Sequence, residues 1–371
     1  MKFLLCCTLV PEKYEIENKA ISNAANRFIT NLTNQIKKEH TLKILSYIGV
    51  SFDNEAKKEL YGKENDNIRY YFKSKEVLTG VFQMLRVIWK EMDACDYAIT
   101  YNVVYAWMLT PIIAKLKQKK SVLILADYSP IEAFVGKKQQ LYAKVQRYFM
   151  GRYDYVIGLS ENTKRYLNSK QKFLCMEGGI AKEFYDYFSI YKKFNHEKVT
   201  LMYSGILEDV TGIKMFVEAF INCKMDNIQL YITGDGSLSE WVVDRCKIDE
   251  RISYYGCIPY DKYMEKLSEA DILVNPRDMN LPENMNNFPS KIMEYLATGK
   301  MVISTRFPGW ERYQEYVLFC ESNVRGLKDS IEKSIPIAKT WNQENYLTTR
   351  EFASKFIWEN QCAKIIKLLR L

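Results

Sequence analysis

Short apolar runs alternate with longer amphipathic segments through the first half of the chain. An unbroken apolar run indicates a strand buried on both faces, and an amphipathic segment indicates a helix that covers a sheet. The predicted strands are 3–9, 41–47, 97–100, 121–126, 155–159 and 172–176, and the predicted helices are 20–38, 76–92, 105–117 and 131–150. This alternation predicts a parallel sheet with helices on both faces.

A second series of the same kind follows a polar, basic stretch at 191–198. Its predicted strands are 199–204, 228–233, 252–255, 272–274 and 301–304, and a last helix is predicted over about 350–369. The chain is therefore predicted to be an α/β protein with two Rossmann-like domains, 1–190 and 199–345, that face each other across a cleft. Ligands of such sheets bind at the carboxyl ends of the strands.

Composition narrows the class of partner. The 371 residues, 47% hydrophobic and 26% charged, suit two globular domains. The formal charge of +8 favours anionic partners, such as nucleotide phosphates, anionic lipid headgroups or nucleic acid. The sequence has no RNP-type motif, no zinc-finger spacing and no compact Lys/Arg tract, so we expect no nucleic-acid partner.

Cysteine usage and the first residues bear on the compartment. The nine cysteines are scattered and include no CxxC pair, which is typical of reduced thiols in a cytosolic protein rather than of disulfides or a metal site. The apolar start of the chain lacks a small-residue cleavage site before Pro11, which favours a buried strand over a signal peptide. We expect a cytoplasmic protein whose membrane association, if any, is peripheral.

The segment 274–299 carries the clearest chemical pattern. An apolar strand ends in Asn-Pro-Arg, and a helix is expected to follow a variable loop. Pro289 suits the first helical position, and Asn287 or Ser290 suits the N-cap. Gly299 suits the left-handed residue beyond the end of the helix.

Charged residues near this helix start indicate an anion site. The first turn of a helix offers free N–H groups and a partial positive charge, so a cation such as Lys291 is disfavoured there unless an anion binds. Arg277 at the strand end adds a forked donor. Glu294, one turn after Lys291, is able to accept hydrogen bonds from a ribose diol. The alternative is a surface Lys291–Glu294 pair and a solvated Arg277.

This segment resembles the donor-binding signature of retaining family-4 glycosyltransferases, which have the GT-B fold. It is most similar to bacterial surface-polysaccharide members with an Asn-Pro-Arg strand end and a Phe-Pro-Ser-Lys helix start. The resemblance implies that Glu294 binds the donor ribose and that Ser290 and Lys291 face the donor phosphates. It also implies an acceptor-side domain over 1–190, a nucleotide-sugar-binding domain over 199–345, and a C-terminal helix within 346–371 that packs back on the first domain.

Other strand ends extend the resemblance. Gly205 ends the first strand of the second domain, and Gly234 ends the next, where backbone approaches the donor. Ile258 lies in the loop whose backbone meets the nucleobase in the family. Asp127 ends a first-domain strand; it is either an acceptor-side base or positioning residue, or a turn residue.

The sequence also departs from the family pattern. Asn286 stands where relatives carry the first of two glutamates, and an amide there is able to bond a sugar hydroxyl. Ile206 and Thr211 stand where relatives often have Arg and Lys. No histidine matches the first-domain histidine of many relatives, and we interpret His40 and His196 as surface residues.

These features predict a hexosyltransferase-type enzyme of the EC 2.4 class. It would move a sugar from a nucleotide diphosphate sugar to an acceptor hydroxyl with retention, in bacterial capsular, exopolysaccharide or O-antigen synthesis. Arg277 and Lys291 would stabilise the leaving diphosphate. We expect a UDP-sugar rather than a GDP-sugar, no cofactor, and no metal, since the chain has no Asp-x-Asp cluster. The alternatives are a non-catalytic degenerate partner subunit and another nucleotide-sugar enzyme such as a sugar 2-epimerase.

The acceptor is expected to be a glycan or a lipid-linked glycan. The segment 131–150 carries Lys137, Lys138, Lys144 and Arg147 among apolar residues. A basic amphipathic helix is typical of binding to an anionic membrane surface, here the inner face of the cytoplasmic membrane. A solvated helix face is the alternative.

Overall fold

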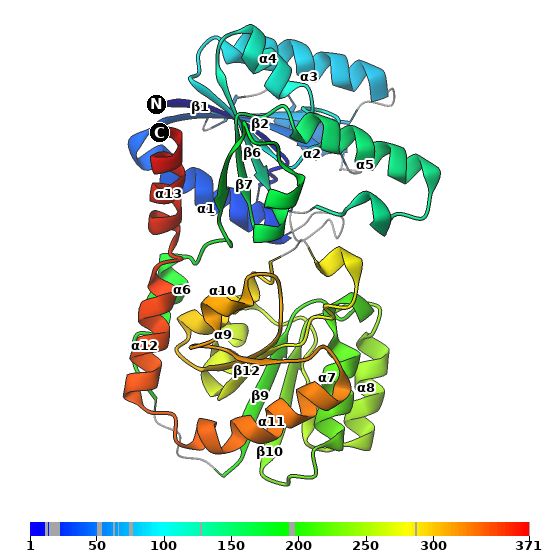
Figure 1. Cartoon of the computed structure of the whole chain (residues 1–371), viewed down its shortest axis with the longest axis vertical. Coiled ribbons are helices and arrows are strands. Elements are labelled where there is room, and N and C mark those ends of the chain that lie inside the picture. The colour runs from blue at the N-terminus through cyan, green and yellow to red at the C-terminus, as the bar shows by residue number, and fades with distance from the viewer. Residues whose placement is uncertain are drawn as a thin grey trace. The chain divides into compact units, whose positions relative to one another are not determined.

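The computed structural model describes residues 1–11, 14, 23–49, 54–61, 64–65, 67–73, 77–126, 128–192, 197–285 and 288–370. The chain forms two compact units. The first comprises Met1–Gly178 together with Trp358–Leu371, and the second comprises Gly179–Ile357 (Figure 1). The second unit is one continuous stretch, whereas the first combines two stretches of the chain. The predicted domain borders do not coincide with the limits of these units, and they stay predictions about where independently folding domains begin and end.

The first unit contains an eight-stranded sheet with the order β3-β4-β2-β1-β5-β6-β7-β8. Every described pairing in it is parallel except β3 with β4. The strands are β1 (Lys2–Cys7), β2 (Thr41–Ile48), β3 (Glu64–Asn65), β4 (Ile68–Phe72), β5 (Tyr97–Tyr101), β6 (Lys120–Leu125), β7 (Tyr155–Gly158) and β8 (Lys172–Cys175).

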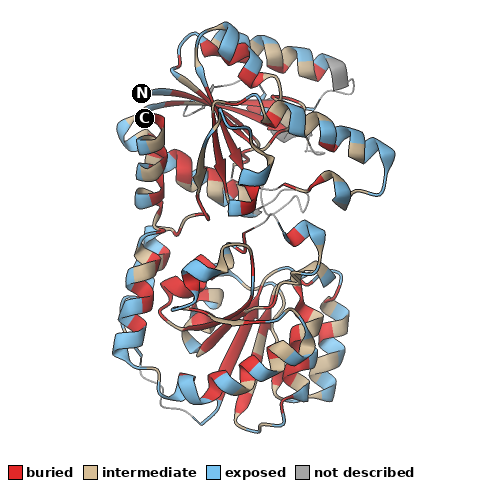
Figure 2. Ribbon diagram, in the orientation of Figure 1, coloured by how far each residue is buried: buried red, intermediate tan, exposed pale blue. Residues whose placement is uncertain are grey.

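Helices cover both faces of this sheet, which explains its unbroken apolar strands. Phe3 and Leu5 pack into a core with α1 and α13, whereas Leu4 packs with α3 and α4 on the other face. Figure 2 shows that the strands of this sheet are mainly buried. Successive strand residues point to opposite faces, so both sets are buried. The helices are α1 (Asn23–Glu39), α2 (Asn54–Leu60), α3 (Val77–Met92), α4 (Thr110–Leu116), η2 (Ile131–Ala133), α5 (Lys137–Met150), η3 (Glu161–Tyr166) and α13 (Trp358–Arg370).

The second unit contains a six-stranded parallel sheet with the order β11-β10-β9-β12-β13-β14. The strands are β9 (Val199–Ser204), β10 (Ile228–Thr233), β11 (Ile252–Tyr254), β12 (Ile272–Asn275), β13 (Met301–Thr305) and β14 (Leu318–Cys320). The helices are α6 (Lys182–Tyr187), η4 (Asp209–Thr211), α7 (Ile213–Asn222), α8 (Ser239–Ile248), α9 (Tyr260–Glu269), η5 (Pro282–Asn284), α10 (Lys291–Ala297), η6 (Trp310–Tyr313), α11 (Val324–Lys339) and α12 (Gln343–Ser354).

The predicted α/β class with two Rossmann-like units is confirmed, and the predicted strands coincide with observed ones to within two residues at each end. Three strands were not predicted: the two-residue β3, β4 and the three-residue β14. The predicted helix 105–117 begins only at Thr110, next to Pro111. The predicted helix 131–150 is interrupted, because α5 starts after Gly136, whose backbone is extended.

A single helix over 350–369 is wrong. The chain leaves α12 at Ser354 and re-enters a helix at Trp358. Between them Ile357 forms a parallel bridge with Ile180, and the Ile180 amide donates to the Phe356 carbonyl at 2.8 Å. This strand-like pairing takes the backbone out of the helix. As a result α12 contacts α10 in the second unit, while α13 contacts α1 in the first.

Over the residues that the structure describes, no helix is both long and apolar enough to span a membrane.

Candidate functional site

The carboxyl edge of the second sheet changes direction between β9 and β12. From β9 the chain adds β10 and β11 on one side of the sheet, and it then returns to add β12 on the other. Open α/β sheets bind ligands at such a switch point. The two strands end at Ser204 and Asn275, and Gly205 and Arg277 follow them.

Lys291 lies over the end of β9. It is the first residue of α10, and its Nζ donates to the Ser204 hydroxyl at 3.3 Å. Its Cε lies 3.4 Å from where a Cβ on Gly205 would stand, and its Nζ lies 5.8 Å from the centre of the Tyr263 ring. Among the described residues no carboxylate pairs with this ammonium, and the alternative Lys291–Glu294 pair is not formed. The half-buried cation therefore faces the strand end without a protein anion.

Backbone packs closely at this edge. The Gly205 amide donates to the Thr233 carbonyl at 3.0 Å, and the Gly234 amide donates to the Gly256 carbonyl at 2.9 Å. Gly234 has φ of 126°, and a Cβ there would lie 1.8 Å from the Gly205 carbonyl oxygen. Only glycine fits this position. The two predicted glycines thus bring the ends of β9 and β10 together beside Lys291.

Arg277 lies on the other side of the switch point. Its Nη1 donates to the Asn284 Oδ1 at 3.4 Å, and its carbonyl accepts from the Thr305 hydroxyl at 2.7 Å. Burial raises the pKa of Tyr203 to about 12, and the nearby Arg277 charge opposes this rise. The Tyr203 hydroxyl lies next to Gly205, 3.2 Å from where a Cβ on that glycine would stand. Arg277 lies near Tyr203 and Lys291 lies near Gly205, so both cations are close to the end of β9.

Sequence reasoning missed Asn284, which it left in a variable loop. The side chain is 2% exposed. Its Nδ2 donates to the Val210 carbonyl at 2.9 Å and to the Asp278 carbonyl at 2.6 Å. It therefore joins the loop after β9 to the loop after β12. An isolated asparagine in a polar loop carries no sequence signal for this role.

Two tyrosines that were also not predicted surround Glu294. Burial raises the pKa of both Tyr263 and Tyr295, and the Glu294 charge adds to each rise. The Tyr295 hydroxyl donates to the Ser204 carbonyl at 3.5 Å. The Tyr263 hydroxyl has no hydrogen-bond partner among the described residues. Glu294, which is half-buried, thus lies near Tyr263, and the Lys291 ammonium also faces the ring of that tyrosine.

The start of α10 differs from the prediction. Ser290 has helical backbone angles and makes no capping bond with its side chain, and Pro289 stands two residues before the first helical residue. The chain enters the helix through a tight turn, in which Ile292 donates to the Pro289 carbonyl at 2.9 Å. Gly299 is confirmed as the left-handed residue, with φ of 72°.

The other predicted residues are Ile258, His40 and several that lie outside the described part of the chain. Ile258 follows β11 and is half-buried. Asp127, Asn286, Asn287 and His196 lie outside the described residues, so their roles stay predictions. His40 is not a plain surface residue, because its half-buried ring lies 5.7 Å from the Phe3 ring.

Metal ligands and cysteines give no further site. In the described ranges, no group of three or more His, Cys, Asp or Glu side chains is placed to hold a metal ion. The nine cysteines are free thiols, and Cys257 is the exposed one.

Comparison with known proteins agrees with this geometry. Residues 198–335 match the family model described as Glycosyl transferases group 1, and that range contains the whole cluster around Lys291. No curated protein matches the chain.

Several solved structures share the fold over the whole chain. Anabaena Alr3699/HepE in complex with UDP has a TM-score of 0.73 at 14% identity and covers 100% of both chains. The same protein in complex with UDP-glucose has a TM-score of 0.70 at 13% identity and covers 100% of both chains. Sucrose-phosphate synthase from Thermosynechococcus elongatus has a TM-score of 0.70 at 14% identity, covering 100% of this chain and 98% of that one. The lipopolysaccharide outer core galactosyltransferase WaaB has a TM-score of 0.68 at 13% identity, covering 100% and 99%.

Proposed function

We propose that this chain, which is a glycosyltransferase of the GT-B type (EC 2.4 class), moves a hexose from a nucleoside diphosphate sugar to an acceptor hydroxyl with retention at the anomeric carbon. The observation that carries the proposal is Lys291, a half-buried cation held over the end of β9 beside Gly205 with no carboxylate partner among the described residues. A diphosphate would supply the missing negative charge. UDP is the favoured nucleotide, since the similar HepE structure holds UDP.

In this mechanism the protein acts mainly through electrostatics. Breaking the bond between sugar and phosphate leaves negative charge on the departing diphosphate, which Lys291 and Arg277 would stabilise. Gly205 and Gly234 let backbone approach the phosphates closely. Glu294 would accept hydrogen bonds from the ribose hydroxyls. The acceptor proton would go to the leaving phosphate, with Asp127 as the acceptor-side positioning residue, and no metal is needed.

Four further expectations remain part of this proposal. Ser290 and Ile258 would contribute donor contacts through the backbone, and Asn286 would bond a sugar hydroxyl. The acceptor would be a glycan or lipid-linked glycan in bacterial capsular, exopolysaccharide or O-antigen synthesis. WaaB, which acts on lipopolysaccharide outer core, supports this direction. The enzyme would work in the cytoplasm, at the inner face of the membrane.

The first test measures sugar transfer and donor hydrolysis with a panel of UDP-sugars and GDP-sugars. We expect Lys291→Ala and Glu294→Ala each to lower turnover by about 100-fold or more, since each removes a group from the donor site. Lys262→Ala is the matched control, because Lys262 is an exposed lysine paired with Glu265 on α9. Its turnover should stay within about twofold of the parent protein.

Two outcomes would contradict the proposal. Near-normal turnover in both site variants would remove the assigned donor site. Donor binding without any transfer or hydrolysis, over the whole panel, would favour the non-catalytic partner subunit instead. A thermal-shift screen with the same donors separates these cases, because a ligand that binds the folded state raises the melting temperature.

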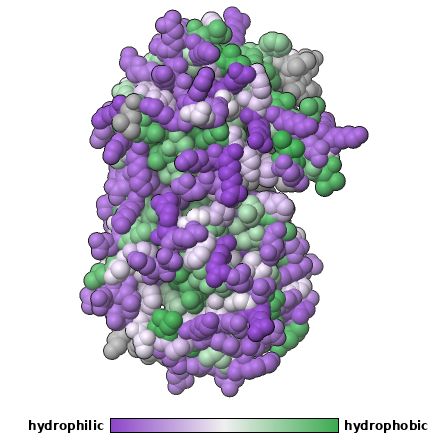
Figure 3. Space-filling view, in the orientation of Figure 1, coloured by the Kyte–Doolittle hydropathy of each residue, from purple (hydrophilic) through white to green (hydrophobic). Residues whose placement is uncertain are grey.

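Membrane association is tested by flotation with vesicles. α5 exposes Leu141 and Tyr148 next to its basic residues, and Figure 3 shows hydrophobic and hydrophilic surface side by side where α5 projects. We expect co-flotation with anionic vesicles at low salt and its loss in Leu141→Ser/Tyr148→Ser. Absence of the parent protein from the floating fraction would exclude the membrane contact.

A further inference from the structure

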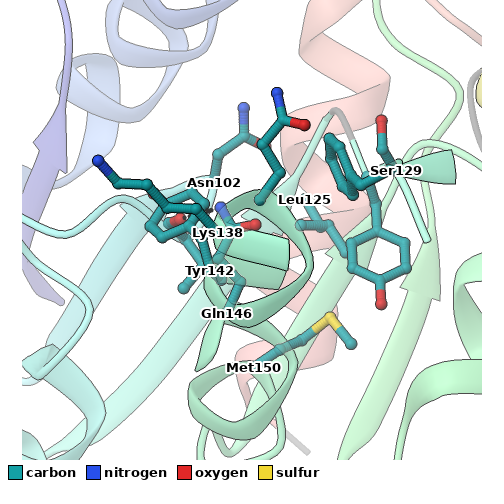
Figure 4. A pocket seen from close by; sticks show the side chains of 11 residues that line it. Asn102, Leu125, Ser129, Lys138, Tyr142, Gln146 and Met150 are labelled. Atoms are coloured by element: carbon teal, nitrogen blue, oxygen red, sulfur yellow. Dashed lines mark hydrogen bonds between the residues drawn. The ribbon is translucent and has the colours of Figure 1, made fainter. Parts of the chain in front are cut away.

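A cavity of about 470 Å³ lies inside the first unit, at the carboxyl ends of β5 and β6 (Figure 4). Asn102 follows β5, and Leu125 ends β6. The opposite wall is α5, which contributes residues at every fourth position, Lys138, Tyr142, Gln146 and Met150. Residues four apart lie on one face of a helix, so a single face of α5 forms this wall.

The walls are mainly apolar. They include Val103, Leu125, Tyr128, Phe134, Tyr142 and Met150. The volume is in the range of small-molecule sites, which are commonly lined by apolar and aromatic side chains with a few polar groups. Such a lining suits an alkyl or isoprenoid chain better than a bare sugar.

One buried polar group lines this cavity without a partner. Tyr128 is 7% exposed, and its hydroxyl has no hydrogen-bond partner among the described residues. Burial raises the pKa of Tyr128, so the group stays a neutral hydrogen-bond donor. A buried hydroxyl that gives up its bonds to water costs free energy, so the wall of the cavity holds an unsatisfied polar group at Tyr128.

Charge at the cavity is positive. Lys138 lines the cavity and is exposed, and α5 holds Lys137, Lys144 and Arg147 but no acidic residue. An apolar cavity lined by one exposed lysine is complementary to a molecule with an apolar chain and an anionic head.

We propose that this cavity binds the acceptor as an anionic amphiphile, with its hydrocarbon chain among Val103, Tyr142 and Met150 and its phosphate at Lys138. The inference rests on the proposed function, and it names the acceptor class of that reaction, a glycan carried on a lipid phosphate or lipid diphosphate, with a sugar hydroxyl that accepts the hexose. The occupant enters the cavity as one molecule, which is different from contact of α5 with a membrane surface.

The test is calorimetric titration of the full-length protein with ethyl, hexyl and decyl phosphate, each below its micelle concentration. Binding should tighten by about threefold for each added methylene that enters the cavity, and then level off. Decyl glucoside should bind about tenfold more weakly than decyl phosphate, and inorganic phosphate should not bind measurably. Equal affinity for ethyl and decyl phosphate would overturn the proposal.

Matched variants on α5 locate the contact. Lys138→Gln should weaken decyl phosphate by about tenfold and leave decyl glucoside within about twofold, because only the charge is lost. Lys144→Gln is the control: Lys144 is also exposed on α5 but does not line the cavity. Ser129→Trp should block both ligands by filling the cavity, and Gln139→Trp, at an exposed lining position, serves if Ser129→Trp fails to fold.

The outcomes separate the proposals from one another. If UDP binds the same sample and decyl phosphate does not, the acceptor inference fails while the donor site stands. If decyl phosphate binds and no nucleotide sugar does, the proposed function fails, while binding of an anionic amphiphile in the cavity stands. Decyl phosphate binding that survives Ser129→Trp and Lys138→Gln but is lost in Leu141→Ser would place the lipid on the outer face of α5, and would overturn the cavity proposal.

Discussion

The carboxyl edges of the two sheets are built in different ways. In the second unit, backbone from neighbouring loops meets so closely that a Cβ on Gly234 would lie 1.8 Å from the Gly205 carbonyl oxygen. In the first unit, side chains from one face of α5 leave a cavity of about 470 Å³ at the equivalent edge. One edge is closed and carries Lys291, which has no carboxylate partner among the described residues, and the other is open and mainly apolar.

The difference indicates that the main chain determines what binds at one edge, and that side chains determine it at the other. At the second edge the main chain itself is positioned, by glycine geometry and by the buried Asn284, so most substitutions there disturb the fold as well as the site. At the first edge the shape depends on side chains of α5 and the loops, which are able to change without moving the sheet. A conserved reaction with a variable acceptor would need this division.

The largest expected effect on stability comes from a substitution at the closely packed edge of the second sheet. Gly234→Ala should lower the free energy of unfolding by about 3 kcal/mol, because both the backbone angle and the contact with Gly205 are unfavourable. Gly256→Ala is the control: it also has a left-handed φ, 65°, but a Cβ there meets nothing within 4 Å. It should cost about 1 kcal/mol.

Denaturant unfolding of both variants measures this difference. Equal losses would show that backbone strain alone, and not close packing of the strand ends, makes glycine necessary at 234. The thermal shift caused by UDP should also disappear in Gly234→Ala and persist in Gly256→Ala.

An intermediate effect concerns the second lysine that flanks α10. Lys300 donates to the Ser268 carbonyl at 3.0 Å and to the Ala270 carbonyl, and burial lowers its pKa to about 8 although Asp271 opposes the shift. In the unfolded chain a lysine keeps its proton until about pH 10.4. The folded state therefore binds fewer protons between these values, and stability should rise with pH across this window.

The rise attributable to Lys300 should be about 1.5 kcal/mol between pH 8 and pH 9.5. Urea unfolding of the parent protein and of Lys300→Met at several pH values isolates it, because other titrating groups are common to both. Parallel profiles would mean that Lys300 keeps its charge in the folded protein.

The smallest effect is expected at the open edge. Tyr128→Phe should change the free energy of unfolding by less than about 1 kcal/mol, in the stabilising direction, because the hydroxyl has no partner among the described residues. A loss of stability of about 2 kcal/mol would instead show that the hydroxyl is paired in the free protein.

The sequence was sufficient where burial on both faces of a sheet determines the pattern. β9 and β10 were predicted to the residue, and Gly205 and Arg277 were expected at the carboxyl ends of their strands, where the structure has them. Asn284 and Tyr263 were not predicted, since their roles depend on contacts between loops that no local period encodes. The cavity was missed for the same reason, although the four-residue spacing from Lys138 to Met150 was present in the sequence.

The helix break after α12 was missed because local helix preference is similar on both sides of it. What interrupts the helix is the pairing of Ile357 with Ile180, which are far apart in the sequence. A single helix was the natural reading of the periodicity, and only a tertiary contact overrides it.

The position of α13 also has a consequence for how the protein is made. Trp358, Ile365 and Leu369 belong to the same core as Phe3 and Leu5, yet they leave the ribosome after the entire second unit. Domains usually fold in the order of their synthesis, with the N-terminal domain first. Here the first unit can complete its core only after the second unit has been synthesised. The second unit can therefore fold first, while one apolar face of the first unit stays exposed to solvent and to chaperones until α13 has been synthesised.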